Sequence, residues 1–156
     1  MKAYRLVHER ALERNEPFSP APNLANRWNN DYPVAYTSDS LALAALEILG
    51  GWGQYDSLDG YQIFTYDLSK AEIEDALHTD PQLNIDSKPA TKRFGDEWAR
   101  SARSLSLRVP SVRLPFSWNY LINPHHSSFS EQKVEHLGPL QWDGAIAGLL
   151  RAVWRR

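Results

Sequence analysis

The run PVAYTSDSLALAALEILGG, residues 33–51, constrains the fold most, because it predicts a strand that leads directly into a helix. Aromatic and β-branched residues over Pro33–Ser38 are typical of a strand, and proline is acceptable at its first position. Ser38 or Asp39 can then cap a helix over Ser40–Leu49, and the two glycines that follow favour its end. We therefore expect a strand–helix unit in this part of the chain.

Glu47 is the only charged residue between Leu41 and Gly53. A carboxylate buried among apolar side chains is costly unless it is paired or protonated. A short surface helix, however, normally exposes one face, and Glu47 could point to solvent from the edge of that face. The pattern alone leaves both interpretations open.

The rest of the chain predicts strands and helices that intermingle without strict alternation. The predicted strands are Ala3–Val7, Tyr61–Leu68, Leu105–Ser111 and Ser117–Pro124; the predicted helices are the segment KAEIEDAL that starts after Ser69, Thr91–Ser104 with Thr91 as its cap, and Trp142–Trp154; Glu16–Asn26 and His78–Ala90 are predicted loops. This order favours a single α+β domain over a doubly wound parallel sheet, and 156 residues suit one domain.

Composition argues against several functions. A net charge of −2 and a pI of about 6.2 disfavour direct nucleic-acid binding, which rests on many contacts with phosphates. The absence of cysteine excludes thiol nucleophiles and disulfides and fits the reducing cytoplasm. No segment approaches the ~20 apolar residues of a membrane span, and the N-terminus lacks the apolar run of a signal sequence. We therefore expect a cytoplasmic protein without a membrane segment.

Familiar metal and cofactor motifs are missing from the sequence. His125 and His126 are adjacent, so their side chains diverge on most backbones, and no spacing typical of a metal site occurs. We expect no metal. The glycine patterns of Rossmann and P-loop nucleotide sites and the Gly-x-Ser-x-Gly nucleophile turn are also absent.

Three residues in and near the strand–helix unit together indicate a nucleotide-like substrate. Arg27 offers a planar fork of donors for phosphate, Tyr36 an aromatic surface, and Glu47 an acid. Taken singly, Arg27 is typical of a surface loop and Tyr36 of a core. Because they fall in one short run, they can converge at one end of the unit.

Four stretches of the chain resemble the RES-domain toxins of bacterial RES–Xre toxin–antitoxin pairs. They are YRLV at Tyr4, NRWNNDYPVAYTSDSLALAALEIL from Asn26, FGDEWARSARSLSLRVPSV from Phe94, and NYLINPHHSSF from Asn119. Their order and spacing follow the family over residues 4–130, and the resemblance implies one RES-like domain over residues 1–156. Many relatives have glycine where this chain has Asn26, and asparagine tolerates positive φ better than most residues.

The resemblance implies a fold related to the ADP-ribosyltransferases, with mixed or antiparallel sheets and flanking helices around an NAD+ cleft. By position, the family's catalytic Arg, Tyr and Glu fall on Arg27, Tyr36 and Glu47. Its Ser falls most plausibly on Ser111, with Ser104 and Ser106 close by in the sequence. We expect Ser111 to bind the substrate through the ribose or the carboxamide, and we also expect substrate-binding roles for Trp28, Asn29 and Asn119.

Members of this family break the bond between nicotinamide and ribose, so the resemblance implies NAD+ as a substrate. Some consume free NAD+ by hydrolysis or phosphorolysis, and others transfer ADP-ribose to a protein. A separate Xre-like antitoxin blocks the cleft, and a homodimer within the toxin–antitoxin complex is one assembly that fits. The acceptor (water, phosphate or a protein side chain) stays open in the sequence, as does the choice between NAD+ and NADP+.

Two other classes of function also fit a small α+β domain. A non-catalytic module could bind NAD+ or a peptide, although binding an anionic nucleotide gains little from an acid such as Glu47. An unrelated enzyme with a carboxylate base would not bind nicotinamide nucleotides. The family-based hypothesis instead assigns Arg27 to the pyrophosphate, Tyr36 to the nicotinamide or its ribose, and Glu47 to the cation that develops on the ribose.

Overall fold

The computed structural model describes residues 1–19, 26–52 and 59–154 and has one mixed seven-stranded sheet. The strands are β1 (Lys2–His8), β2 (Ala35–Ser38), β3 (Tyr61–Asp67), β4 (Ile73–Asp75), β5 (Ser106–Pro110), β6 (Trp118–Ile122) and β7 (Val134–Pro139). Their order in the sheet is β4-β5-β6-β2-β1-β3-β7. β4 and β5 pair in parallel, and the other neighbours pair antiparallel. The predicted α+β class is confirmed.

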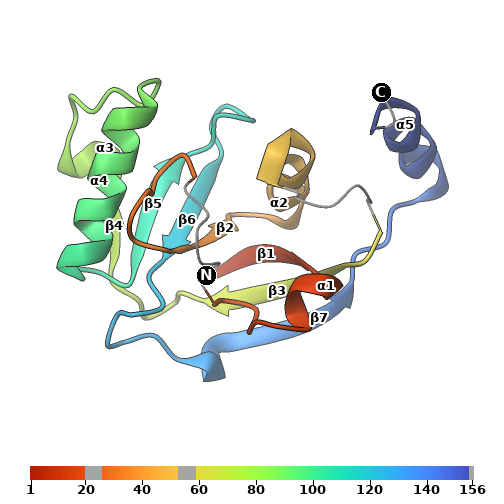
Figure 1. The fold of residues 1–156 in the computed structure, drawn as a ribbon, viewed down its shortest axis with the longest axis horizontal. Coiled ribbons are helices and arrows are strands. Elements are labelled where there is room, and N and C mark those ends of the chain that lie inside the picture. Colours follow the sequence, from red (N-terminus) through yellow and green to blue (C-terminus); the bar gives the residue numbers. More distant parts are fainter. Residues whose placement is uncertain (20–25, 53–58, 155–156) are drawn as a thin grey trace.

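Five α-helices and two short helical turns surround this sheet in the described residues (Figure 1). The helices are α1 (Glu9–Leu12), α2 (Leu41–Glu47), α3 (Ala76–Thr79), α4 (Lys88–Ser101) and α5 (Gly144–Trp154); the turns are η1 (Ile48–Trp52) and η2 (Glu131–Lys133). α2 runs into the π-type turn η1, where Gly51 has a φ of 128° that an L-residue side chain disfavours. α2 thus ends two residues before the predicted Leu49, and the turn that follows it includes both glycines and departs from helical geometry at Gly51.

Helices α2 and α4 cover the same face of the sheet. Leu107 of β5 and Leu121 of β6 pack in one cluster with Trp98 of α4. Leu6 of β1 and Tyr61 of β3 pack with Ala44 and Ala45 of α2. Strand alternation and the β2–β6 register place Tyr36, Ser38, Asn119 and Leu121 on this face too. The polar members of that set lie between the two helices, where a site can form.

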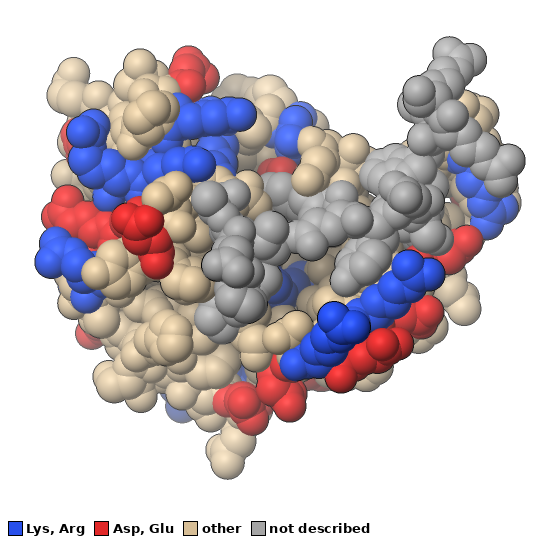
Figure 2. All heavy atoms as spheres, in the orientation of Figure 1, with Lys and Arg blue, Asp and Glu red and all other residues tan. Residues whose placement is uncertain are grey.

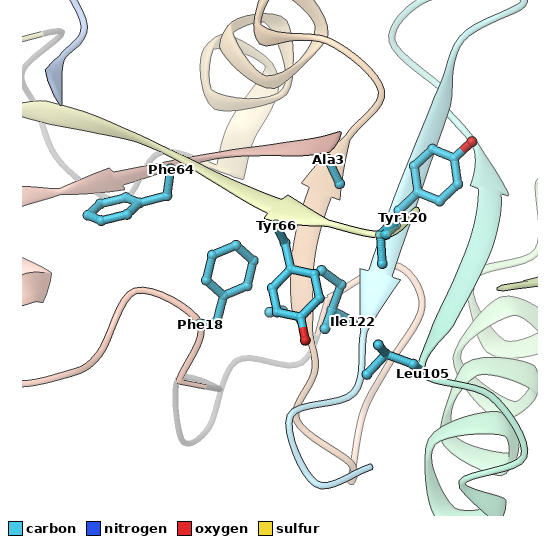
Figure 3. Close-up of a cluster of buried hydrophobic side chains, with 9 residues drawn as sticks. Ala3, Phe18, Phe64, Tyr66, Leu105, Tyr120 and Ile122 are labelled. Carbon is cyan, nitrogen blue, oxygen red and sulfur yellow. The ribbon is translucent and has the colours of Figure 1, made fainter. Parts of the chain in front are cut away.

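The opposite face of the sheet carries the other large core cluster (Figure 3). Phe18, from the segment after α1, packs there against Tyr66 of β3 with ring centroids 5.4 Å apart. The remaining members come from five strands or their flanks: Ala3, Ala35, Phe64, Leu68, Leu105, Tyr120 and Ile122. The central strands are thus covered on both faces, and polar side chains on the face that α2 and α4 cover can form a site.

One predicted helix is wrong. The segment after Ser69 forms β4 and the single turn α3, because Ile73 pairs with Ser106 of the neighbouring strand. Pairing at the edge of the sheet overrides the local helical pattern there. Helix α1 and strand β7 were not predicted from the sequence; β7 pairs with β3 through a register shift between Ile63 and Phe64.

Two predicted helix caps lie at other residues. The side chain of Ser40 accepts from Leu43 N and caps α2, in place of Ser38 or Asp39. Ser87 caps α4, which begins three residues before Thr91. Thr91 is fully buried inside the helix, and its hydroxyl donates to the Arg27 carbonyl at 2.7 Å. It therefore ties α4 to the loop that precedes β2. Of the predicted loop Glu16–Asn26, residues 20–25 lie outside the described part of the chain.

Candidate active site

A pocket of about 320 Å³ opens between α2, α4 and the β5–β6 connection. Figure 1 shows α4 and α2 with β5 and β6 between them. The lining residues are Asn26, Arg27, Trp28, Tyr36, Glu47, Lys88, Lys92, Val109, Pro110, Val112, Arg113 and Asn119. Most residues that the sequence singled out are therefore brought together, although they come from a loop, two strands and a helix.

Glu47 is buried at the base of this pocket, with 2% of its surface exposed. Its Oε1 accepts from Ser111 Oγ at 2.8 Å and from Asn119 Nδ2 at 2.7 Å. Ser38 Oγ donates to Asn119 Oδ1 at 2.8 Å and fixes the orientation of that amide. The interpretation that Glu47 points to solvent is wrong, and the buried carboxylate is held by two donors on one oxygen.

Of the three candidate serines, Ser111 is the one that contacts Glu47. Ser104 instead accepts from Trp98 Nε1 at 2.8 Å and donates to the Ser106 carbonyl. Ser111 directly follows β5, and its neighbours Pro110 and Val112 line the pocket. Its hydroxyl also accepts from the backbone N–H of Arg113 at 3.0 Å, so the start of the β5–β6 connection is organised around Glu47.

Arg27 is held mainly through its backbone, which leaves part of its guanidinium available. Its N–H donates to Asn26 Oδ1 at 2.8 Å, and its Nη2 donates to the Ile85 carbonyl. Its Nε is buried and has no hydrogen-bond partner among the described residues. Asn26 does not adopt positive φ, so it acts here through its side chain. An anionic ligand could satisfy the remaining donors of Arg27.

Tyr36 is fixed by hydrogen bonds on its phenol oxygen. That oxygen accepts from Trp28 N at 3.1 Å and donates to Asn29 Oδ1 at 2.6 Å. Burial raises the pKa of Tyr36, so the phenol keeps its proton and remains a donor. Trp28 packs edge-on against Phe94 of α4 with ring centroids 6.5 Å apart. Trp28 lines the pocket, whereas Asn29 is buried behind Tyr36 and holds it in place.

Half-buried Arg5 supports Tyr36 from the backbone side. Its Nη1 donates to the Tyr36 carbonyl at 2.9 Å and its Nε to the Pro17 carbonyl at 2.8 Å. Burial lowers the pKa of Arg5 to about 10, which still leaves it charged at neutral pH. Arg5 belongs to the YRLV stretch, which thus helps to place β2 rather than to line the pocket.

Three further cations line the pocket and were not predicted from the sequence: Lys88, Lys92 and Arg113. With Arg27 they face a single acid, Glu47, among the described lining residues. Figure 2 shows Lys and Arg side chains gathered on the side of the molecule that carries α4. Lys88 and Lys92 are four residues apart and share a helix face, but residue 88 fell in a predicted loop. The positive lining favours an anionic ligand.

Residues 1–19, 26–52 and 59–154 show neither a cluster of metal ligands nor a membrane-spanning helix. They contain no group of three or more His, Asp or Glu side chains placed to hold a metal ion. None of their helices combines the length and apolarity that crossing a membrane requires.

The chain belongs to the RES domain family, whose model matches residues 2–143. The match extends beyond the resemblance over residues 4–130 that the motifs indicated, and it includes β7. The family assignment is thereby confirmed.

Curated relatives cover most of this chain. It is 33% identical over 133 residues to a protein of Yersinia enterocolitica named Toxin Res, with 83% of this chain and 88% of that one covered. A Toxin Res of Photorhabdus laumondii is 29% identical over 134 residues, covering 83% and 85%. A Sphingobium protein named Prs ADP-ribosylating toxin is 35% identical over 109 residues, covering 64% and 66%.

The fold also has a solved counterpart. A chain in the crystal structure of the M. tuberculosis MbcT–MbcA toxin–antitoxin complex superposes with a TM-score of 0.68 at 15% sequence identity. The superposition covers 97% of this chain and 89% of that one. At this identity the likeness concerns the fold alone.

Proposed function

We propose that this protein is the toxin of a toxin–antitoxin pair and that it cleaves the nicotinamide–ribose bond of NAD+, with water or phosphate as the acceptor. The observation that carries the proposal is Glu47, a buried carboxylate held by Ser111 and Asn119 in a pocket lined by four cations. The names of the curated relatives support the toxin role.

Glu47 supplies what this reaction needs at the ribose. As nicotinamide leaves, positive charge develops on the sugar ring, as it does in glycoside cleavage. A fixed carboxylate in a site with little water stabilises that charge far better than one in bulk solvent. Because Ser111 and Asn119 both donate to Oε1, Oε2 is the oxygen that can face the ribose. The two donors hold the carboxylate in place before the reaction starts.

The rest of the pocket suits a dinucleotide. Arg27, with an unsatisfied buried Nε, would bind the diphosphate, and the lysines on α4 would add positive charge at the same wall. Tyr36 and Trp28 would pack on the flat ring or the sugar beside Glu47. Ser111 and Asn119 would orient Glu47, and Asn29 would act through Tyr36. No metal is required by this scheme.

The test is Glu47→Gln, followed by proton NMR of NAD+. The amide oxygen of glutamine can keep both hydrogen bonds that Oε1 accepts, so the fold and NAD+ binding are expected to survive. Loss of the negative charge should reduce nicotinamide release by about 100-fold or more. Glu97→Gln is the matched control, because it removes an acid that is 60% exposed on α4.

Either acceptor can be recognised in the same spectra. Release that requires inorganic phosphate indicates phosphorolysis, and ADP-ribose as co-product indicates hydrolysis. Near-normal turnover by Glu47→Gln would overturn the role of the acid. Folded wild-type protein, separated from any antitoxin, that binds NAD+ without releasing nicotinamide would overturn cleavage of free NAD+.

Transfer of ADP-ribose to a protein is the second candidate, favoured by the name of the Sphingobium relative. Labelled NAD+ in a cell lysate distinguishes it, because a labelled protein band would appear only with wild type. We also propose an Xre-like antitoxin as the partner, since the solved counterpart comes from a toxin–antitoxin complex. Co-expression with a helix-turn-helix protein encoded beside this chain should then suppress nicotinamide release.

A further inference from the structure

Arg113 stands against the oxygen of Glu47 that the proposed reaction needs. Its Nε lies 3.6 Å from Glu47 Oε2, while Oε1 is already taken by Ser111 and Asn119. A guanidinium at this place neutralises the carboxylate and adds positive charge beside a ribose that is itself becoming positive. In this position Arg113 therefore opposes the stabilisation that Glu47 provides in the proposed reaction.

The contacts of Arg113 are of a kind that can be exchanged. The Nε–Oε2 distance of 3.6 Å is too long for a hydrogen bond, and the Arg113 side chain is 40% exposed. Its Nη2 donates to the carbonyl of Gly50 in η1. An ion pair with one exposed partner is weak, because water and salt compete with it.

Gly50 provides the space that Arg113 fills. A Cβ at residue 50 would lie 2.3 Å from Arg113 Nε and 2.7 Å from its Cδ, both atoms of a flexible side chain. Only side-chain atoms of Arg113 are among its nearest contacts. The backbone of residue 50 has no positive φ that would exclude alanine. Gly50→Ala should therefore displace the guanidinium and leave the surrounding backbone in place.

We propose that Arg113 moves from Glu47 to the diphosphate of the dinucleotide when the substrate binds. The diphosphate offers the fork of Arg113 a better anion than a carboxylate already saturated on one oxygen. Its departure frees Glu47 Oε2 for the ribose, so the acid is exposed only when a substrate with a diphosphate is in the pocket. This inference rests on the proposed cleavage of NAD+.

Two substitutions should change the Michaelis constant for NAD+ in opposite directions. Arg113→Ala removes a charged contact with the substrate and should raise KM by about 10- to 100-fold while kcat stays close to wild type. Gly50→Ala displaces Arg113 from its competing contacts with Glu47 and the Gly50 carbonyl and should lower KM by up to about fivefold. The double variant should behave like Arg113→Ala, and Arg113→Lys should restore part of the affinity.

Arg93→Ala is the matched control, since it removes an exposed positive charge of α4 that does not line this pocket. It should leave KM unchanged. A fall in kcat in both Arg113→Ala and Gly50→Ala, at unchanged KM, would mean that Arg113 supports Glu47 in place, and the proposal would be wrong. If the Arg113 and Gly50 variants changed the KM for inorganic phosphate and left the KM for NAD+ unchanged, the proposal would also be wrong. Arg113 would then bind the phosphate that acts as acceptor and not the diphosphate of the substrate.

A second measurement does not depend on turnover. In ¹⁵N-labelled protein, the Nε–Hε signal of Arg113, assigned by its loss in Arg113→Ala, should shift when inorganic pyrophosphate is added. It should shift without any ligand in Glu47→Gln and Gly50→Ala. If wild-type protein releases nicotinamide but its Arg113 Nε–Hε signal does not shift with pyrophosphate, the proposed movement of Arg113 is excluded. Absence of nicotinamide release by wild type would count against the proposed function, whatever the signal of Arg113 does.

Discussion

At the scale of single residues, the site depends on side chains that hold other side chains. Asn119 has its carbonyl oxygen fixed by Ser38 and its amide nitrogen on Glu47, so its orientation is set by two partners. Tyr36 is placed in the same way, by Trp28 and Asn29 on one oxygen. The ring of Tyr36 lines the pocket, and its hydroxyl anchors the loop before β2. The two parts of Tyr36 can therefore be tested separately.

Tyr36→Phe should lower stability more than activity. It keeps the ring but leaves the buried Trp28 N–H and Asn29 Oδ1 without these bonds, which should reduce the free energy of unfolding by about 1–3 kcal/mol. Nicotinamide release from folded protein should fall little, whereas Tyr36→Ala, which also removes the ring, should abolish most of it. Urea unfolding and the NMR assay measure the two effects. Equal losses of activity in both variants would assign the reaction to the hydroxyl.

At the scale of elements, α4 is pressed against the loop that carries Arg27 and Trp28. Gly95 makes this approach possible, because a Cβ there would lie 1.7 Å from the Trp28 carbonyl oxygen. Thr91, one turn earlier, donates to the Arg27 carbonyl. Through these two contacts with the loop backbone, α4 fixes the position of the loop relative to the sheet.

Gly95→Ala should therefore be destabilising, although alanine favours a helix. The Trp28 carbonyl belongs to the backbone and cannot move aside, so α4 and the loop must separate, at a cost of at least about 1–3 kcal/mol. Nicotinamide release should fall as well, since the loop carries Arg27. Gly148→Ala in α5 is the control: its Cβ meets nothing within 4 Å, so stability should stay equal or rise slightly. Thermal unfolding of both variants checks this, and equal stabilities would contradict the close contact.

The sequence predicted elements where local pattern and tertiary structure agree. The strand–helix unit with Glu47 has strong capping and apolar signals, so β2 and α2 were found with small errors at their ends. The segment after Ser69 failed because the helical pattern there is overridden by pairing of Ile73 with β5. Thr91 was predicted as a cap, because the loop on which it packs lies more than sixty residues away in the sequence.

Only the part of the candidate site that lies close together in the sequence could be predicted from local pattern. Arg27, Tyr36 and Glu47 fall in one short run, so they could be grouped without a structure. Ser111 and Arg113 reach Glu47 only because β6, which follows them, pairs with β2, and this places the β5–β6 connection above the end of α2. A register of this kind cannot be read from composition or spacing.

At the scale of the whole molecule, α5 stands apart from the core that forms the site. In Figure 1 it lies at the opposite end of the view from α4. Ile146 and Leu149 are 44% and 66% exposed, and Ala147 is the buried residue among its described side chains. The family match ends at residue 143, just before this helix. The packing of its described side chains therefore contributes little to the stability of the sheet and its two covering helices.

A chain that ends at Asp143 should fold and keep its activity. Trp142, which packs beside the cluster of α2, is retained, and the described side chains of the lost helix bury little apolar surface, so the free energy of unfolding should change by less than about 1 kcal/mol. The pocket is lined by residues 26–119, so KM and kcat for NAD+ should match those of the full chain. Urea unfolding and the NMR assay decide the matter. A much larger loss of stability, with turnover intact, would mean that α5 belongs to the folding unit but not to the site. Loss of turnover in a stable, truncated protein would mean that residues after Asp143 take part in the reaction, and a site formed by residues 26–119 alone would be wrong.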